Sequence, residues 1–119
     1  MELIERNQEF IEKTINYINN QLINIENTKN LNGKEHWIKK TGEQSAYLEA
    51  KIMLKNYREV RVLELKRAKF FIINNLILNL QQDIQQKNKT WVLGCQTAIN
   101  DLEFRFKINE TKWENENNE

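Results

Sequence analysis

The feature that most constrains this chain is its longest apolar run, Phe70 to Leu80, which three asparagines interrupt. On a helix at about 100° per residue, most of the apolar side chains fall on one broad face, while Phe71 and Leu78 form a second stripe. Both sides then need covering, because each large apolar side chain left in water forgoes about 1.5–3 kcal/mol. The run is also much shorter than the roughly 20 apolar residues of a membrane span. It therefore predicts a central helix with partners on both flanks.

The residues before this run predict two amphipathic segments separated by a loop. Residues 2 to about 27 carry apolar residues at helical spacing. Residues 27–42 contain several turn formers and predict the longest loop. Thr41 and Gln44 have the spacing of a capping box, which predicts that a second helix begins there. From about 43 to 86, apolar residues recur at a mean spacing close to 3.5, as in a coiled coil, which predicts a long central helix of some forty residues. A kink near 61–67 is an equally compatible alternative.

A third helix is expected from about Thr90. One face would carry Trp91, Cys95, Ala98, Ile99, Leu102 and Phe106, and a second face would carry Leu93, Phe104 and Ile108. The alternative is a small β-hairpin near 102–113, because apolar and charged residues alternate there with period 2. The small residues Ala50 and Cys95 are predicted to mark the crossing of the second and third helices.

These patterns predict an all-α fold, an elongated bundle of three main helices with a long central helix, completed by dimerisation. The alternative fold class is α+β, with the hairpin near 102–113. We expect a single helical domain over 1–109 and an acidic tail over 110–119 that frays. A helix of some forty residues exceeds what its own short partners can cover, which is why self-association is expected.

Composition argues against several classes of function. Eighteen Lys and Arg residues against 17 Asp and Glu residues leave the net charge near zero, unlike a generally basic nucleic-acid binder. Cys95 and His36 are the single cysteine and histidine, so neither an intrachain disulfide nor a Cys/His zinc site is expected. Ser45 and His36 lack the pattern of a catalytic triad. We expect no enzyme, no catalytic residue, no cofactor and no metal, and a cytoplasmic protein without a signal peptide or membrane anchor.

Some apolar residues lie on second stripes, outside the main apolar face of their helix, and these predict a protein-binding surface. These residues are Phe71, Leu78, Phe104 and Ile108. The leading hypothesis is therefore a non-enzymatic module that binds another protein. Small helical chains rich in Asn, Ile and Lys resemble bacteriophage and mobile-element accessory proteins. By that analogy the partner is a host defence protein, and the chain is an inhibitor of the anti-CRISPR kind.

Two other functions remain open. A basic row on the second helix predicts salt-dependent binding of nucleic acid or a nucleotide, through Lys51, Lys55, Arg58, Arg61, Lys66 and Lys69. The competing interpretation of this row is a solvated helix face. The third hypothesis is a self-assembling structural oligomer with no other partner.

Overall fold

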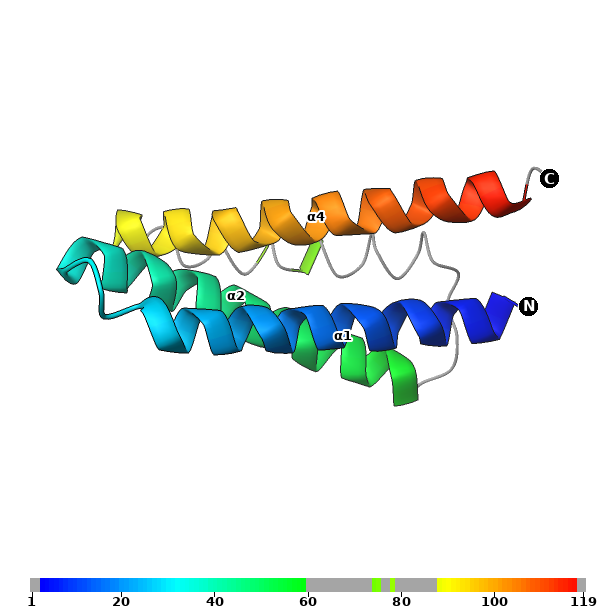
Figure 1. Cartoon of the computed structure of the whole chain (residues 1–119), viewed down its shortest axis with the longest axis horizontal. Helices are drawn as coiled ribbons and strands as arrows, with labels where there is room; N and C mark the ends of the chain where they lie inside the picture. The colour runs from blue at the N-terminus through cyan, green and yellow to red at the C-terminus, as the bar shows by residue number, and fades with distance from the viewer. Residues whose placement is uncertain (1–2, 60–73, 76–77, 79–87, 118–119) are drawn as a thin grey trace.

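The fold is described from a computed structural model, which defines residues 3–59, 74, 75, 78 and 88–117 and the side chains of 8–56, 74, 75, 78 and 88–107. Three helices are present, α1 (Leu3–Thr28), α2 (Lys34–Glu59) and α4 (Lys89–Asn117) (Figure 1). No strand occurs within the described ranges. The predicted all-α fold is confirmed. Residues 102–113 are helical, so the hairpin alternative is wrong.

The bundle is elongated, with extents of 49 × 28 × 25 Å. The helices α2 and α4 run parallel, and α1 runs antiparallel to both (Figure 1). Contacts between side chains fix these directions: Glu35 meets Thr90 near the starts of α2 and α4, and Tyr47 meets Asp101 further along both. In the opposite sense, Phe10 near the start of α1 packs on Phe106 late in α4, with ring centroids 5.2 Å apart. None of the described helices combines the length and apolarity that a bilayer crossing requires.

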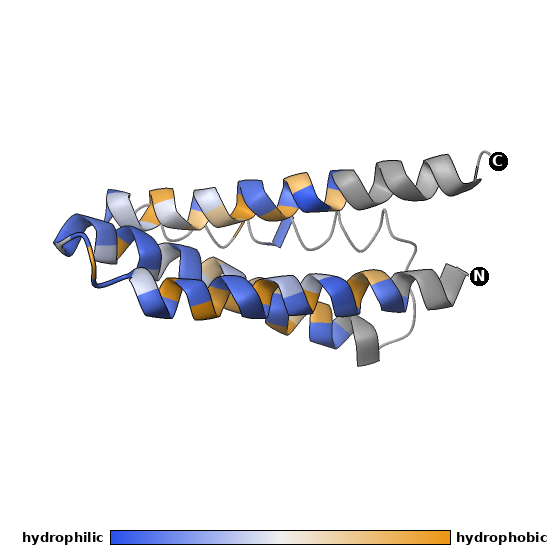
Figure 2. Cartoon of the chain, viewed as in Figure 1, coloured by the Kyte–Doolittle hydropathy of each residue, from blue (hydrophilic) through white to orange (hydrophobic). Residues whose placement is uncertain are grey.

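The core is built from the helix faces that the sequence periodicity predicts. In Figure 2, hydrophobic residues recur between hydrophilic ones along each helix. The buried apolar residues are Phe10, Ile11, Ile15, Ile18, Ile25, Ala46, Tyr47, Ala50, Leu54, Cys95, Ala98, Ile99, Leu102 and Phe106. The predicted inner face of the third helix is confirmed, because five of its six residues are buried and Trp91 is partly buried against them.

Two glycines let α2 and α4 approach backbone to backbone. A Cβ atom built on Gly42 would lie 2.0 Å from the Trp91 carbonyl oxygen, and one built on Gly94 would lie 1.9 Å from the Lys39 carbonyl oxygen. The Cys95 thiol donates to the Gly42 carbonyl at 3.3 Å in the same crossing. The prediction that Cys95 marks the crossing is therefore confirmed. Ala50 is buried about two turns further along α2 and does not mark the crossing. The small residue of α2 that lies beside Cys95 at the crossing is Gly42.

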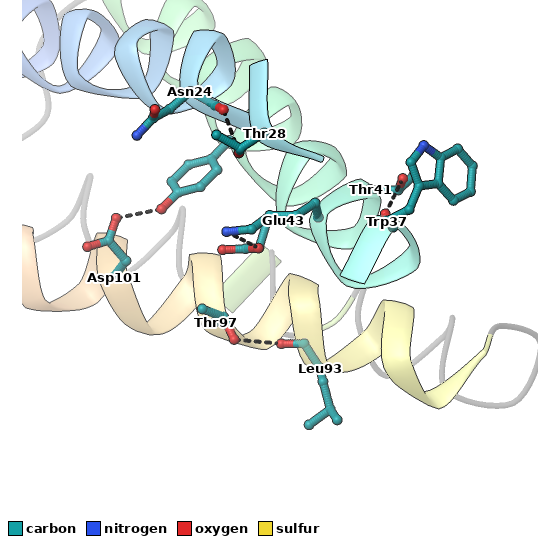
Figure 3. Close-up of polar contacts among 10 residues, drawn as sticks. Asn24, Thr28, Trp37, Thr41, Glu43, Leu93, Thr97 and Asp101 are labelled. Carbon is teal, nitrogen blue, oxygen red and sulfur yellow. Dashed lines mark hydrogen bonds and ion pairs between the residues drawn. The ribbon is translucent and has the colours of Figure 1, made fainter. Parts of the chain in front are cut away.

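The connection between α1 and α2 is much shorter than predicted. Only residues 29–33 lie outside the helices, so the expected loop over 27–42 is wrong. The turn ends at Gly33, whose φ of 90° favours glycine, and α2 begins at the next residue. The capping-box prediction is also wrong, because Thr41 lies inside α2 and its hydroxyl donates to the Trp37 carbonyl at 2.8 Å (Figure 3). The bond between Glu35 and Thr90 and the close approach of Lys39 to Gly94 tie this early part of α2 to α4.

Two predictions fall partly or wholly outside the described residues. Of the long central helix predicted over about 43–86, α2 is described as far as Glu59, and of the apolar run only residues 74, 75 and 78 are described, all helical. One straight helix over the whole range is wrong, because it would be about 66 Å long, whereas Thr90 bonds to Glu35 near the start of α2. The helix α4 reaches Asn117, so the backbone of 110–117 is helical. The division into a domain over 1–109 and a fraying tail, like dimerisation, stays a prediction.

Candidate functional site

The outer face of α2 is a continuous uncharged surface on the side away from α4. We define the α2 outer face as Trp37, Ile38, Thr41, Ser45, Leu48 and Ile52. Leu48 is 44% exposed and Ile52 is 59% exposed, and Trp37 is also exposed. In Figure 3 the Trp37 side chain points away from the neighbouring helix α4. Trp37, Thr41 and Leu48 lie about 100° or more around the helix from Gly42 and Ala46, which face α4 and the core. Ile38 and Ser45 lie only about 40–60° from Gly42, at the edge of the face that is nearer to α4.

Lysines lie at both ends and along one edge of the α2 outer face, and the exposed Glu49 lies along the other edge. Lys34 lies one turn before Trp37 and Lys55 lies one turn after Ile52, and both are exposed. The half-buried Lys51 lies along one edge. No ion pair involves any of these three lysines in the described part of the chain. The predicted basic row thus adjoins an apolar surface.

A second, smaller uncharged surface lies on α4. We define the α4 outer face as Leu93, Thr97, Asn100 and Phe104. Leu93 is 56% exposed and Phe104 is 63% exposed. Their separation of eleven residues brings them to within about 20° of each other around the helix. The Thr97 hydroxyl donates to the Leu93 carbonyl at 2.9 Å, and the Leu93 side chain points away from the bundle (Figure 3).

Among the residues predicted to bind a protein, Phe104 and Leu78 are exposed. Phe71 lies outside the described residues, as does the side chain of Ile108. Among the residues of the predicted basic row, Lys51 and Lys55 are described. The side chain of Arg58 and the whole of Arg61, Lys66 and Lys69 lie outside the described residues.

A polar cluster joins all three helices, and the sequence patterns did not predict it. The hydroxyls of Tyr17 and Tyr47 both donate to Oδ2 of Asp101, each at 2.5 Å. The Arg105 guanidinium lies 3.6 Å from the centroid of the Tyr17 ring. Burial, followed by the hydrogen bond to Asp101, raises the pKa of both tyrosine hydroxyls, and it raises that of the buried Tyr47 furthest. Because both hydroxyls are directed at one carboxylate oxygen, the arrangement serves to fix the three helices relative to one another.

This cluster predicts a pH-dependent loss of stability. Tyr47→Phe is expected to lower the free energy of unfolding by about 1–2 kcal/mol at neutral pH, since a buried hydrogen bond is lost. Because the pKa of Tyr47 is raised on folding, its contribution is complete below the unfolded-state pKa of about 10 and declines above it. The difference between the native protein and Tyr47→Phe should therefore shrink above pH 10 in urea titrations. A difference that stays constant from pH 8 to 11 would contradict this account.

The residues considered for nucleophilic chemistry are not brought together as a triad. Ser45 is exposed on α2, whereas Cys95 is buried at the crossing with α4. His36 is half-buried, and its Nε2 atom has no hydrogen-bond partner among the described residues. Within the described ranges, no three metal-ligating side chains gather.

Comparisons with known proteins add no family to this description. No family model matches the chain, and no curated protein or solved structure is significantly similar to it.

Proposed function

We propose that this chain is a non-enzymatic module that binds another protein. The observation that carries the proposal is the grouping of large exposed apolar side chains on the uncharged outer faces of α2 and α4. Protein interfaces are depleted of charge at their centres and enriched in aromatic residues, with polar residues around the rim. Trp37 and Phe104 supply one aromatic side chain to each face.

The proposal places the protein in a reducing, cytoplasmic setting, in which the buried Cys95 side chain stays a thiol. Inhibition of a bacterial defence protein is one role that such binding would serve, and the compositional analogy with phage accessory proteins is its support. The alternative of a homodimer uses the same faces.

Affinity capture with matched variants tests the proposal. The tagged protein is mixed with lysate of its source cells, with and without nuclease, and the captured proteins are identified by mass spectrometry. A stoichiometric protein that survives nuclease treatment is expected. The yield of this captured protein should fall at least about tenfold when a central apolar residue of the face that binds it is replaced by a polar one, since such residues dominate the binding energy.

The variants are Leu48→Ser for α2 and Phe104→Ser for α4, and Ile23→Ser is the control. Ile23 is 60% exposed on α1, so its replacement makes a similar chemical change away from both faces. Capture that neither face variant reduces, or that Ile23→Ser reduces equally, would contradict the proposal.

The nucleic-acid alternative rests on Lys51 and Lys55, which carry no ion pair in the described part of the chain. Nucleic acid that co-purifies and is lost steeply with salt would favour this alternative over protein binding. Charge reversal at both lysines should then abolish the binding, whereas Phe104→Ser should leave it unchanged.

A further inference from the structure

The α2 outer face has the residue spacing of a helix–helix contact. Ile38, Thr41, Ser45, Leu48 and Ile52 follow one another at steps of 3, 4, 3 and 4 residues. These are successive a and d positions of a heptad, the pattern along which one helix packs on another. The two hydroxyl side chains in the middle are small, so a partner backbone has room to approach closely there.

The ends of the same heptad series are positively charged. Lys34 and Lys55 occupy the d positions immediately before and after the uncharged stretch, about 30 Å apart along the helix. Lys51 lies at a g position beside Leu48 and Ile52. On the opposite edge, Glu49 already makes an interaction within the chain. The apolar centre is therefore bordered by cations that have no carboxylate partner within the described residues.

We infer that the α2 outer face binds an amphipathic helix of another protein whose apolar stripe is flanked by Glu or Asp. This inference rests on the proposed protein-binding function and adds the chemistry of the partner. The apolar stripe would cover Leu48 and Ile52, and the carboxylates would meet Lys34, Lys51 and Lys55. Charges placed in this way fix the partner and its register more than they add affinity.

Charge favours this partner over a second copy of the chain. If two copies paired in parallel through the whole face, Lys34 would oppose Lys34 and Lys55 would oppose Lys55. If they paired antiparallel, a positions would face d positions, so Lys55 of one copy would face Ile38 of the other, or Lys34 would face Ile52. The parallel arrangement sets like charges together, and the antiparallel one sets a lysine against an apolar side chain, and both are unfavourable. Single-stranded nucleic acid fits less well, because aliphatic Leu48 and Ile52 occupy positions where bases would need aromatic surfaces to stack on.

Two synthetic peptides test the inference. Each has three heptads with Leu at a and d; one carries Glu at every e and g position, and the other carries Lys. The like charges at e and g oppose self-association of each peptide. Binding of the fluorescein-labelled peptides to the full chain is measured by anisotropy at low salt, with sedimentation equilibrium of the chain alone alongside.

The acidic peptide is expected to bind at least about tenfold more tightly than the basic one, and salt should weaken its binding. Leu48→Ser and Ile52→Ser should each weaken it at least about tenfold, while the exposed control Ile23→Ser should not. The triple variant Lys34→Glu, Lys51→Glu, Lys55→Glu should reverse the preference between the two peptides. That reversal distinguishes charge complementarity from non-specific binding to the apolar residues.

Three outcomes would overturn the inference. In the first, the two peptides bind with equal affinity or neither peptide binds. In the second, Leu48→Ser does not reduce binding of the acidic peptide. In the third, the chain alone is a dimer that Leu48→Ser dissociates. In any of these cases a stoichiometric protein captured from lysate would still support the proposed function. Failure of the capture experiment itself would instead remove the protein-binding proposal.

Discussion

Replacing Gly94 by Ala is expected to lower the free energy of unfolding by about 2 kcal/mol or more, even though alanine is the better helix former. The new Cβ atom would stand 1.9 Å from the Lys39 carbonyl oxygen, which belongs to the backbone of α2 and cannot rotate away. Overpacking of this kind costs about 3 kcal/mol, against a gain of about 1 kcal/mol from helix propensity. Gly42→Ala should behave in the same way, because its Cβ would meet the Trp91 carbonyl oxygen.

The two glycine substitutions should also be non-additive. Both methyl groups enter one crossing, so helices that have moved apart for the first have already made room for the second. The double variant should therefore cost at least about 1 kcal/mol less than the sum of the single variants. Urea denaturation followed by circular dichroism at 222 nm measures all three. Asn100→Ala, on the exposed side of α4, is the control and should change stability by no more than about 0.5 kcal/mol.

Neutral or stabilising effects of Gly94→Ala would contradict the close approach of α2 and α4. Strict additivity of the two substitutions would show instead that the two glycines relieve separate contacts.

Phe106→Ala should be among the most destabilising substitutions, at about 3–5 kcal/mol. The Phe106 side chain is 0% exposed and packs on Phe10, so its removal loses both apolar burial and a ring contact. Phe104→Ala is the matched control: it makes the same chemical change two residues away, at an exposed position. Its expected effect is no more than about 0.5 kcal/mol.

This pair of variants also tests the period-2 pattern of residues 102–108. On a strand, Phe104 and Phe106 would point to the same face, and the two substitutions would have similar effects. On α4 they lie about 200° apart, and only one of them is in the core. Comparable losses of stability in urea titrations would favour the strand interpretation and contradict the helix.

Local periodicity was enough to predict the core-facing sides of α1 and α4. Ile11, Ile15 and Ile18 repeat at helical spacing and are buried as a group. Cys95, Ala98 and Leu102 do the same on α4. Such predictions succeed because burial of one helix face is repeated at every turn, so that single exceptions do not change the pattern.

The α2 outer face illustrates an error that began with a boundary. The sequence predicts the start of the helix near Thr41, which places Trp37 and Ile38 in a loop and hides the heptad spacing that begins at Ile38. The signal was present in the steps of 3 and 4 residues from Ile38 to Ile52. On α4, by contrast, the periodicity predicts the second stripe, and its residues Leu93 and Phe104 are exposed.

The sequence by itself determined the all-α class, the inner faces of α1 and α4 and the second stripe on α4, because each depends on residues close together in the chain. The tertiary structure decided how those helices meet. Gly42 and Gly94 acquire their role only when α2 and α4 lie parallel, and Asp101 becomes a junction only when Tyr17 and Tyr47 reach it from two other helices. Tyr17 and Tyr47 lie 84 and 54 positions before Asp101 in the sequence, and both of their hydroxyls donate to the same carboxylate oxygen of Asp101. No periodicity along one helix carries that information, because it arises from packing between helices.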